Sequence, residues 1–490
     1  MNPIQRIARN SAAPIATQLL NKAVDFGFAL VVLRALGKAG NGEYAFAVLI
    51  WLYAKTFSDF GLSLLATREV ARDRRLAGEY LGLTTLLRLL LWLIAVPLVT
   101  LFTLAFRQGV GLSTASTLAI VLLILSIVPD SYSDAANSIY NAFERMEIPA
   151  ALTFAKNLLK VALGLTLLAA GWGVPGLALT ALLTNLLTAG AFGLLLRRLD
   201  VRPRWRLPGD VARRMLIESW PLFLNALLAG LFFRSDIFVL KAARGDAEVG
   251  LYDAAYKFIN LALLVPQYFT LALFPHLSRL AALRDSAFGA TYTLALKLLF
   301  ILALPLCVAT TLLAPDLMWL LGGQDFLPEA GTALRILIWF LPFSYVNGLV
   351  QYVLIAAGLQ RSLIPAFGLT AAFNLIANLL FTPRFGYQAA ALITIGSELV
   401  LLGPFFWLLR QRIGTLPEPR AILRPILAAL VMGAIAWPLQ HAIAAQGLAA
   451  LAPWIATIVG SVAYLVTLVA TGAIGPTERR LALRLLNRAA

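Results

Sequence analysis

Long apolar runs follow one another along almost the whole chain, and only short polar loops separate them. A helix needs roughly 20 apolar residues to cross the hydrocarbon core of a bilayer. Within that core a chain must satisfy its backbone hydrogen bonds internally, which favours helices. The runs therefore predict an all-α polytopic membrane protein with about 14 transmembrane helices. We place these helices at residues 11–34, 43–63, 80–106, 115–140, 149–170, 174–196, 217–240, 250–275, 288–312, 330–357, 361–381, 386–409, 422–442 and 450–472.

The composition agrees with a membrane protein. Hydrophobic residues make up 60% of the chain and charged residues 13%, whereas a soluble domain carries about 25% charged residues. The one cysteine, Cys307, lies within an apolar run. This excludes a disulfide within the chain and a thiolate metal site. We expect no bound metal and no cofactor.

The net charge of +16 comes from basic residues that are spread over many loops. Cytoplasmic loops of membrane proteins carry an excess of Lys and Arg, so this charge indicates orientation and not nucleic-acid binding. One side of the membrane receives Arg6, Arg9, Arg68, Arg72, Arg74, Arg75, the arginines of 197–214, Arg279, Arg284, Arg410, Arg412, Arg420, Arg424, Arg479, Arg480, Arg484 and Arg488. The opposite loops hold mainly Arg107, Arg244 and Arg384. Both termini are therefore predicted to be cytoplasmic, and the apolar run from Ala12 is predicted to be the first span and not a cleaved signal.

Two segments of the chain resemble each other. The first is GNGEYAFA, Gly40–Ala47, and the second is EVGLYDAA, Glu248–Ala255. Aligning Gly42 on Gly250 gives an offset of 208 residues. A period of that length in so apolar a chain predicts two homologous bundles of membrane helices, an architecture that transporters use to place a substrate between the halves.

The repeat and the loops divide the chain into five predicted parts. These are an N-terminal six-helix lobe (1–196), a basic cytoplasmic linker (197–216), a C-terminal six-helix lobe (217–409), two additional transmembrane helices (410–472) and a cytoplasmic tail (473–490). The linker contains two prolines and seven arginines. The tail carries arginines and leucines at helical spacing, which predicts an amphipathic helix on the membrane surface.

Several ionisable side chains fall inside the predicted spans. Each costs about 2.5–3.5 kcal/mol on insertion scales, so such residues persist where they face a cavity or a partner. Most lie on the first two spans of each lobe, which the repeat makes equivalent. We predict that these ionisable residues, together with the polar Asn225, line one central cavity and bind substrate: Lys22, Asp25, Arg34, Lys55, Asp59, Asn225, Arg234, Asp236, Asp253, Lys257, Lys297 and Glu398.

Charge neutralisation within the protein is the alternative for the residues at 234, 236, 253 and 257, because they lie in the outer halves of neighbouring spans. Lys22 and Lys55 have fewer acids at matching depth, so we expect them to attract an anionic group such as a phosphate. Asp130 and Asp134 lie four residues apart in the fourth span. The lysines at 156 and 160 lie on one face of the fifth span and are expected to snorkel towards the membrane surface.

Nothing in the sequence predicts an enzyme. It contains no GxxxxGK[ST], HExxH or GxSxG motif, which are the signatures of a phosphate-binding loop, a zinc protease and a serine hydrolase. No loop is long enough for a soluble catalytic domain. The two histidines, His276 and His441, lie near span ends, where packing is favoured over a proton relay.

Four motifs in order resemble a known family. They are DFGLSLLATREVAR (Asp59–Arg72), RSDIFVL (Arg234–Leu240), EVGLYDAAYKF (Glu248–Phe258) and LFPHLSRL (Leu273–Leu280). Together they resemble the polysaccharide and oligosaccharide flippases of the multidrug/oligosaccharidyl-lipid/polysaccharide (MOP) exporter superfamily. The motifs cover residues from about 25 to 285, and the span number and two-lobe plan extend the resemblance to the whole chain.

The resemblance implies a V-shaped, MATE-like pair of six-helix lobes related by a pseudo-two-fold axis. It also implies alternating access and a lipid-linked oligosaccharide substrate, carried on a polyprenyl diphosphate across the bacterial inner membrane. Such transport serves cell-surface polysaccharides such as O-antigen or exopolysaccharide. Membrane lipids and a polysaccharide polymerase are then the expected partners of a monomer. In related lipid II flippases, two extra helices form a groove for the lipid tail. This chain lacks the dense arginines of that branch in its first span, so transport of general polysaccharide repeat units is expected.

Three other functions are weighed against this one. An ion-coupled drug exporter of the same superfamily binds cations, and acids should then dominate its cavity, whereas lysines and arginines are at least as frequent here. A membrane glycosyltransferase or polymerase requires paired acids and a large outer loop. A scaffolding protein would tolerate the removal of its intramembrane charges.

Overall fold

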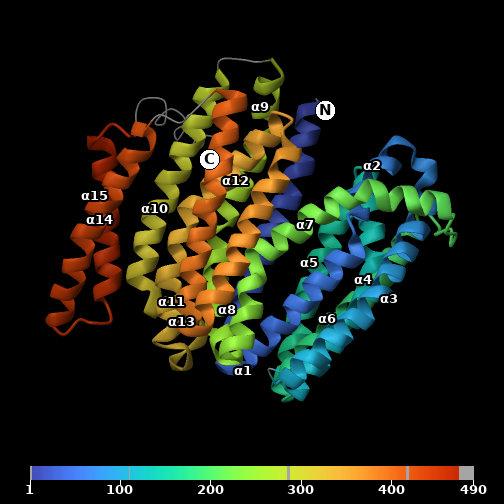
Figure 1. Ribbon diagram of the computed structural model, residues 1–490, viewed down its shortest axis with the longest axis horizontal. Helices are drawn as coiled ribbons and strands as arrows, with labels where there is room; N and C mark the ends of the chain where they lie inside the picture. The colour runs from blue at the N-terminus through green and yellow to red at the C-terminus, as the bar shows by residue number, and fades with distance from the viewer. Residues whose placement is uncertain (1–2, 110, 284–286, 415–418, 474–490) are drawn as a thin grey trace. The chain divides into compact units, whose positions relative to one another are not determined.

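The computed structural model describes residues 3–109, 111–283, 287–414 and 419–473, and within these ranges every regular element is helical (Figure 1). The helices are α1 (Pro3–Asp59), α2 (Leu62–Arg72), α3 (Ala77–Gly109), α4 (Thr114–Ala142), α5 (Glu147–Ala169), α6 (Gly173–Arg197), α7 (Gly209–Arg244), α8 (Asp246–Ala262), α9 (Leu264–Leu283), α10 (Ala287–Gly322), α11 (Glu329–Leu337), α12 (Leu341–Ala356), α13 (Leu363–Leu408), α14 (Pro419–Ala445) and α15 (Ala452–Ala470). Short turns of 3₁₀ helix lie at Arg74–Leu76, Gln324–Phe326, Ile338–Phe340 and Gln360–Ser362, and a turn of π helix lies at Leu409–Ile413. The predicted tail falls on residues 474–490, outside the described ranges.

Eleven helical stretches are long and apolar enough to cross a membrane. One of them, Gln360–Gln411, contains a bend at Gly386, and α1, which is not among the eleven, bends at Gly37. Dividing these two helices at their glycines gives fourteen segments of membrane-spanning length. This confirms the predicted all-α polytopic class.

The two bends replace loops that the sequence predicts near residues 35–42 and 382–385. Gly37 has φ 65° and ψ −176°, and Gly386 has φ 60° and ψ −145°. Residues with a Cβ rarely adopt such angles, whereas glycine does so at little cost. One glycine is therefore enough to redirect the chain between consecutive spans.

The described chain forms two compact units, which we treat separately. Unit 1 runs to Ala254 and includes Leu321–Asp325 and Thr382–Gly386; unit 2 consists of Ala255–Leu320, Phe326–Phe381 and the residues from Tyr387 onward. Within unit 1, α4 packs against α6 and α1, and α2 packs against α4 and α3. Within unit 2, α14 packs against α15, and α9 packs against α12.

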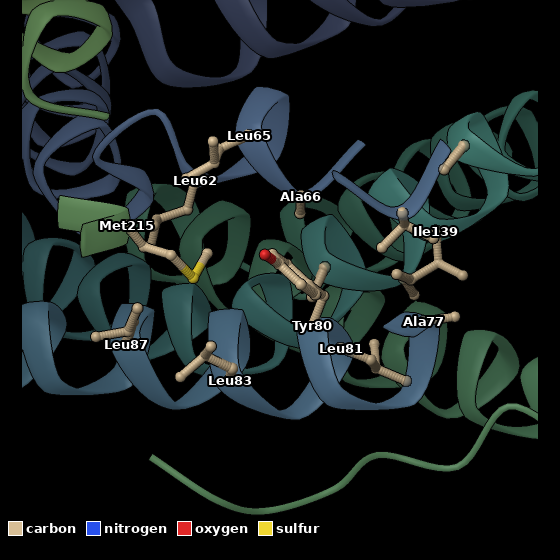
Figure 2. Close-up of a cluster of buried hydrophobic side chains, with 14 of the residues drawn as sticks. Leu62, Leu65, Ala66, Ala77, Tyr80, Leu81, Leu83, Leu87, Ile139 and Met215 are labelled. Carbon is tan, nitrogen blue, oxygen red and sulfur yellow. The ribbon is translucent and has the colours of Figure 1, made fainter. Parts of the chain in front are cut away.

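The apolar core of unit 1 explains why α2 forms a separate helix after the second span. Leu62, Leu65, Ala66 and Val70 recur at helical spacing, and all four are buried. Figure 2 shows the first three beside side chains of α3, with Met215 of α7 in the same cluster. Fully burying one such leucine or valine contributes about 1.5–3 kcal/mol. The face of α2 opposite this core carries its arginines.

The two copies of the repeated segment contact each other inside unit 1. A Cβ added to Gly42 would overlap the carbonyl oxygen of Asp246, and a Cβ added to Gly250 would overlap that of Lys38. Lys38 and Asp246 are themselves 208 residues apart, so the two contacts are equivalent under the repeat. Reciprocal contacts of this kind are the property of a two-fold interface.

The bends on either side of this crossing repeat as well. Gly37 and Gly245 are also 208 residues apart, and their backbone angles nearly coincide, since Gly245 has φ 85° and ψ −173°. The offset that the sequence predicts thus relates two bends and one close helix crossing. We call the segments 37–44 and 245–252 the glycine crossing.

Candidate functional site

Two aspartates of α4 organise the largest group of charged side chains at membrane depth. Asp130 and Asp134 lie one helical turn apart and therefore face the same side. Lys55 of α1 pairs with both of them, because its ammonium group contacts Asp130 Oδ2 and lies 3.4 Å from Asp134 Oδ2. The side chain of Asp130 is only 5% exposed. A carboxylate so far from water is stable only with partners of this kind.

Asp130 also binds a second cation. Its Oδ1 atom lies 3.4 Å from Nζ of Lys156 on α5. The carboxylate therefore links α1 to α5 through α4. Lys156 points into the helix bundle and does not snorkel to the membrane surface as predicted, because a buried acid lies within its reach.

A third cation, Arg88 of α3, pairs with the end of α1. Its guanidinium donates to Asp59 Oδ1 at 2.9 Å and to the hydroxyl oxygen of Ser63 at 2.7 Å. Ser63 in turn donates to the same Asp59 oxygen at 2.6 Å. Arg88 is 1% exposed and is the largest fully buried side chain of the described chain. It joins α3 to the junction of α1 and α2.

These side chains form what we call the charge cluster: Lys55, Asp59, Arg88, Asp130, Asp134 and Lys156. Its three cations and three anions balance. The space that its side chains enclose is too small to admit a water molecule. In this conformation the cluster therefore holds helices together and does not present a bare cation to an anion.

The sequence predicts fewer acids at the depth of Lys55, whereas in the structure its ammonium group pairs with two aspartates. Its partner Asp130 is 75 residues away in the sequence. The sequence indicates how deep each residue lies in the membrane, but it does not indicate which face of each helix points towards its neighbour.

The first half of α1 carries a second ion pair. Lys160 of α5 pairs with Asp25 and lies 6.0 Å above the ring of Phe28. Lys22 and Arg34, on the same half of α1, are both exposed. Among the residues that the structure describes, no ion pair involves Lys22.

Two buried acids, one on α7 and one on α8, lie next to neutral hydrogen-bond donors. Asp236 is buried and accepts a hydrogen bond of 2.6 Å from Tyr252. Asp253 is buried and lies 3.5 Å from the side-chain nitrogen of Asn41, which also donates to the carbonyl of Gly250 at 2.9 Å. These bonds attach both acids to the glycine crossing.

Other candidates of this region differ in exposure. Arg234 is half-buried and Asn225 is exposed. A salt bridge that the sequence does not predict joins the buried Lys241 to Asp246. The ammonium of Lys241 also lies 5.7 Å above the ring of Phe46.

In unit 2 the buried acid is Glu398 of α13. It is 1% exposed, and the side-chain nitrogen of Asn347 on α12 donates to its Oε2 at 2.6 Å and to its backbone carbonyl at 2.9 Å. The neighbouring Ser397 accepts a hydrogen bond of 2.9 Å from Asn374. Lys257 and Lys297 are half-buried. Unit 2 thus holds a buried carboxyl group that is hydrogen-bonded by the Asn347 amide and the Ser344 hydroxyl.

The structure brings together only part of the predicted set. Lys55 and Asp59 belong to the charge cluster, whereas Asp25 pairs separately with Lys160, and Asp236 and Asp253 lie at the glycine crossing. Sequence reasoning missed Arg88 altogether. Its signal was a lone arginine in the apolar run TTLLRLLLW, which at membrane depth requires a partner.

Two family models match the chain. The model described as polysaccharide biosynthesis protein matches residues 7–281, and the model described as MatE matches residues 221–383. The first match covers more than half of the chain, including the charge cluster and the glycine crossing. No curated protein matches the sequence.

Solved structures resemble the fold over most of its length. The lipid II flippase MurJ in an inward closed conformation has a TM-score of 0.75 at 15% identity, and the alignment covers 92% of this chain and 97% of MurJ. An inward-facing multidrug resistance MATE family transporter has a TM-score of 0.64 at 19% identity, with 80% and 94% covered. A MOP superfamily transporter from Pyrococcus furiosus, whose binding pocket of reverse polarity suggests a different function, has a TM-score of 0.55 at 18% identity, with 84% and 95% covered. At these identities the likeness establishes the fold.

Proposed function

This chain belongs to the polysaccharide biosynthesis protein family of the MOP superfamily of transporters and flippases, and we propose that it moves polyprenyl-diphosphate-linked oligosaccharide repeat units across the bacterial inner membrane. The family match over residues 7–281 is the observation that carries the proposal. The sugar and its diphosphate are polar, so they cross a bilayer only through a protein that replaces their contacts with water.

The geometry supports transport by alternating access. The glycine crossing gives the two repeats a close contact without large side chains, with a glycine bend beside each copy. Hinges need positions that absorb changes in φ and ψ. Each polar group described above is held by contacts within a single unit, so it can keep those contacts during the proposed transport cycle.

Lys22 and Arg34 are the α1 side chains that we propose meet the diphosphate. Both are exposed on a helix that also carries buried residues, such as Leu33. Ammonium and guanidinium groups bind phosphate oxygens through charge-assisted hydrogen bonds. We further propose that the termini are cytoplasmic and that the protein contains no catalytic site.

A lipid-flipping assay tests this function. Purified protein is reconstituted into liposomes with a fluorescent polyprenyl-diphosphate oligosaccharide, and a membrane-impermeant quencher reports the fraction of lipid in the outer leaflet. We expect wild-type protein to raise the rate of exchange and Lys22→Ala to lower it by about tenfold, the loss of one charge-assisted contact. Arg361→Ala, an exposed arginine on the Gln360–Ser362 turn, is the matched control and should keep the wild-type rate.

Ion-coupled export of cationic drugs is the second candidate, because the MatE model matches residues 221–383. The same liposomes, loaded with a fluorescent organic cation and given a proton or sodium gradient, distinguish the two. Cation movement without lipid movement would overturn the flippase proposal. Lipid movement that Lys22→Ala leaves unchanged would instead remove Lys22 from the proposed substrate contacts.

A further inference from the structure

The segment between α6 and α7 is held directly against the first turns of α3. The backbone N–H of Arg204 donates to the carbonyl of Gly78 at 2.8 Å. The carbonyl oxygens of Arg202 and Arg204 approach Gly78 and Gly82 so closely that a Cβ at either glycine would overlap them. Two glycines four residues apart on α3 thus leave room for the backbone of residues 202–204 to lie directly against the helix. The sequence predicts only a polar linker here.

Two cavities flank this extended backbone, and both are lined by Val201, Arg202 and Pro203. One cavity has a volume of about 620 Å³ and also meets Tyr132 and Trp205. The other has a volume of about 500 Å³ and is the more basic, and we call it the arginine cavity. Its charged lining residues are Arg74, Arg75, Asp200, Arg202 and Arg204. Both volumes fall within the range of small-molecule sites, about 300–1,000 Å³.

The arginine cavity carries an uncompensated charge. Four arginines and one acid, Asp200, make up its charged lining, so basic groups outnumber acidic ones. The nearby Asp73, whose carboxylate accepts the backbone N–H of Arg75 at 3.0 Å, adds a second negative charge, and the four arginines still outnumber the two acids. Arg74 lies 5.3 Å above the ring of Phe143, which fixes its position. An excess of basic groups around one cavity attracts an anion.

The position of the cavity identifies the kind of anion. It lies where α3 begins and where α4 and α6 end, at one end of three membrane-spanning helices. Trp205 on the adjoining segment is 55% exposed. Exposed tryptophan next to arginine is typical of the level of lipid head groups. Guanidinium groups bind phosphate oxygens through paired hydrogen bonds, so phosphate is the fitting group.

We propose that the arginine cavity binds the phosphate of an anionic lipid head group. The site is separate from the charge cluster and does not depend on which cargo the protein moves. A bound head group would fix the segment 199–207 to α3 and neutralise its arginines.

Native mass spectrometry of the full-length protein in detergent tests the proposal, with short-chain phosphatidylglycerol as the probe and short-chain phosphatidylcholine as the zwitterionic reference. We expect the triple variant Arg74→Gln, Arg202→Gln, Arg204→Gln to weaken phosphatidylglycerol binding by about tenfold or more, the effect of losing charged hydrogen bonds. The matched control is Arg361→Gln, Arg384→Gln, Arg420→Gln, which removes the same charge from exposed arginines outside the cavity and should bind within about twofold of wild type.

Equal binding by the two triple variants would overturn the proposal. Competition by inorganic phosphate forms the second arm: if the cavity arginines affect phosphate binding but not phosphatidylglycerol binding, the ligand is soluble phosphate and the lipid assignment fails. Should the glutamine triple variant not fold, Arg74→Gln and Arg204→Gln are measured singly. Each is expected to weaken binding by about threefold or more, with Arg361→Gln unchanged.

Discussion

At the scale of residues, the charge cluster shows how an apolar bundle accommodates six ionisable groups. Each member has an opposite charge within reach. Charges in a medium of low dielectric attract one another strongly but also pay a large desolvation penalty. The cluster therefore adds little net stability as a whole, while the loss of one partner is costly.

Arg88 is the clearest test of that asymmetry. Arg88→Met removes the partner of Asp59 from a site where the arginine is 1% exposed. We expect a loss of about 3 kcal/mol in the free energy of unfolding, because an uncompensated carboxylate remains. Thermal unfolding in detergent measures it. The double variant Arg88→Met, Asp59→Leu should recover most of the loss, and a double variant as unstable as the single one would contradict this reading.

The two lysines that meet Asp130 should differ in effect. Lys55→Gln removes the lysine that lies between Asp130 and Asp134, so the two carboxylates repel each other across one helical turn. After Lys156→Gln, each aspartate still pairs with Lys55. We therefore expect the larger fall in melting temperature for Lys55→Gln, and a partial recovery for Lys55→Arg. Melting curves of the three variants at one pH and one lipid content decide it. An equal fall for both lysines would mean that Lys55 does not bridge the two acids.

At the scale of elements, the glycine crossing explains why α1 and α8 approach so closely. Glycine at 42 and at 250 allows two backbones to touch, as small residues do at membrane helix interfaces. Gly37 and Gly245 lie at the starts of the two crossing segments, and the chain changes direction at each of them. Close packing and redirection therefore occur in the same short segments.

Gly42→Ala and Gly250→Ala should each disrupt this contact, because the added methyl group overlaps a backbone carbonyl that cannot move independently. We expect both variants to lose stability and transport by similar amounts, as equivalent positions should. Gly27→Ala on α1 is the matched control, because a Cβ there has no atom within 4 Å. Size-exclusion profiles and the lipid-flipping assay compare them. Normal behaviour of Gly42→Ala would contradict the close crossing.

At the scale of the whole molecule, the predicted orientation follows from the distribution of arginines. The chain offers a direct test because its one cysteine, Cys307, is buried and donates to the carbonyl of Ile338 at 3.3 Å. After Cys307→Ala, a new cysteine can be placed at either of two tryptophans that are each 55% exposed, Trp172 and Trp205. They lie on either side of α6 and should therefore face opposite sides of the membrane.

We expect an impermeant maleimide to label Trp172→Cys in intact cells and to label Trp205→Cys only after the membrane is opened. This outcome places the segment between α6 and α7 in the cytoplasm, in agreement with its arginines. Labelling of both from outside, or of Trp205→Cys alone, would reverse the predicted topology. The matched exposure of the two sites ensures that a difference reports membrane sidedness.

The sequence by itself determined the class of this protein, the approximate places of its spans, the 208-residue repeat and the presence of charges at membrane depth. These are properties of hydrophobic length and local pattern, and the family resemblance rested on motifs that read along the chain. Asp25, Lys55 and Asp59 were found in this way because a charge inside an apolar run is visible without any partner.

Only the tertiary structure decided which charges meet. Lys55 pairs with Asp130, and Arg88 pairs with Asp59, because of how the helices are rotated and packed. The sequence pattern of a single span does not reveal that rotation. The bends at Gly37 and Gly386 likewise replace loops that the sequence predicts. A single glycine with a positive φ is enough to redirect the chain, so no polar loop is needed. Pairing at membrane depth is set by the face that each helix presents, and that face is fixed by packing across the whole bundle.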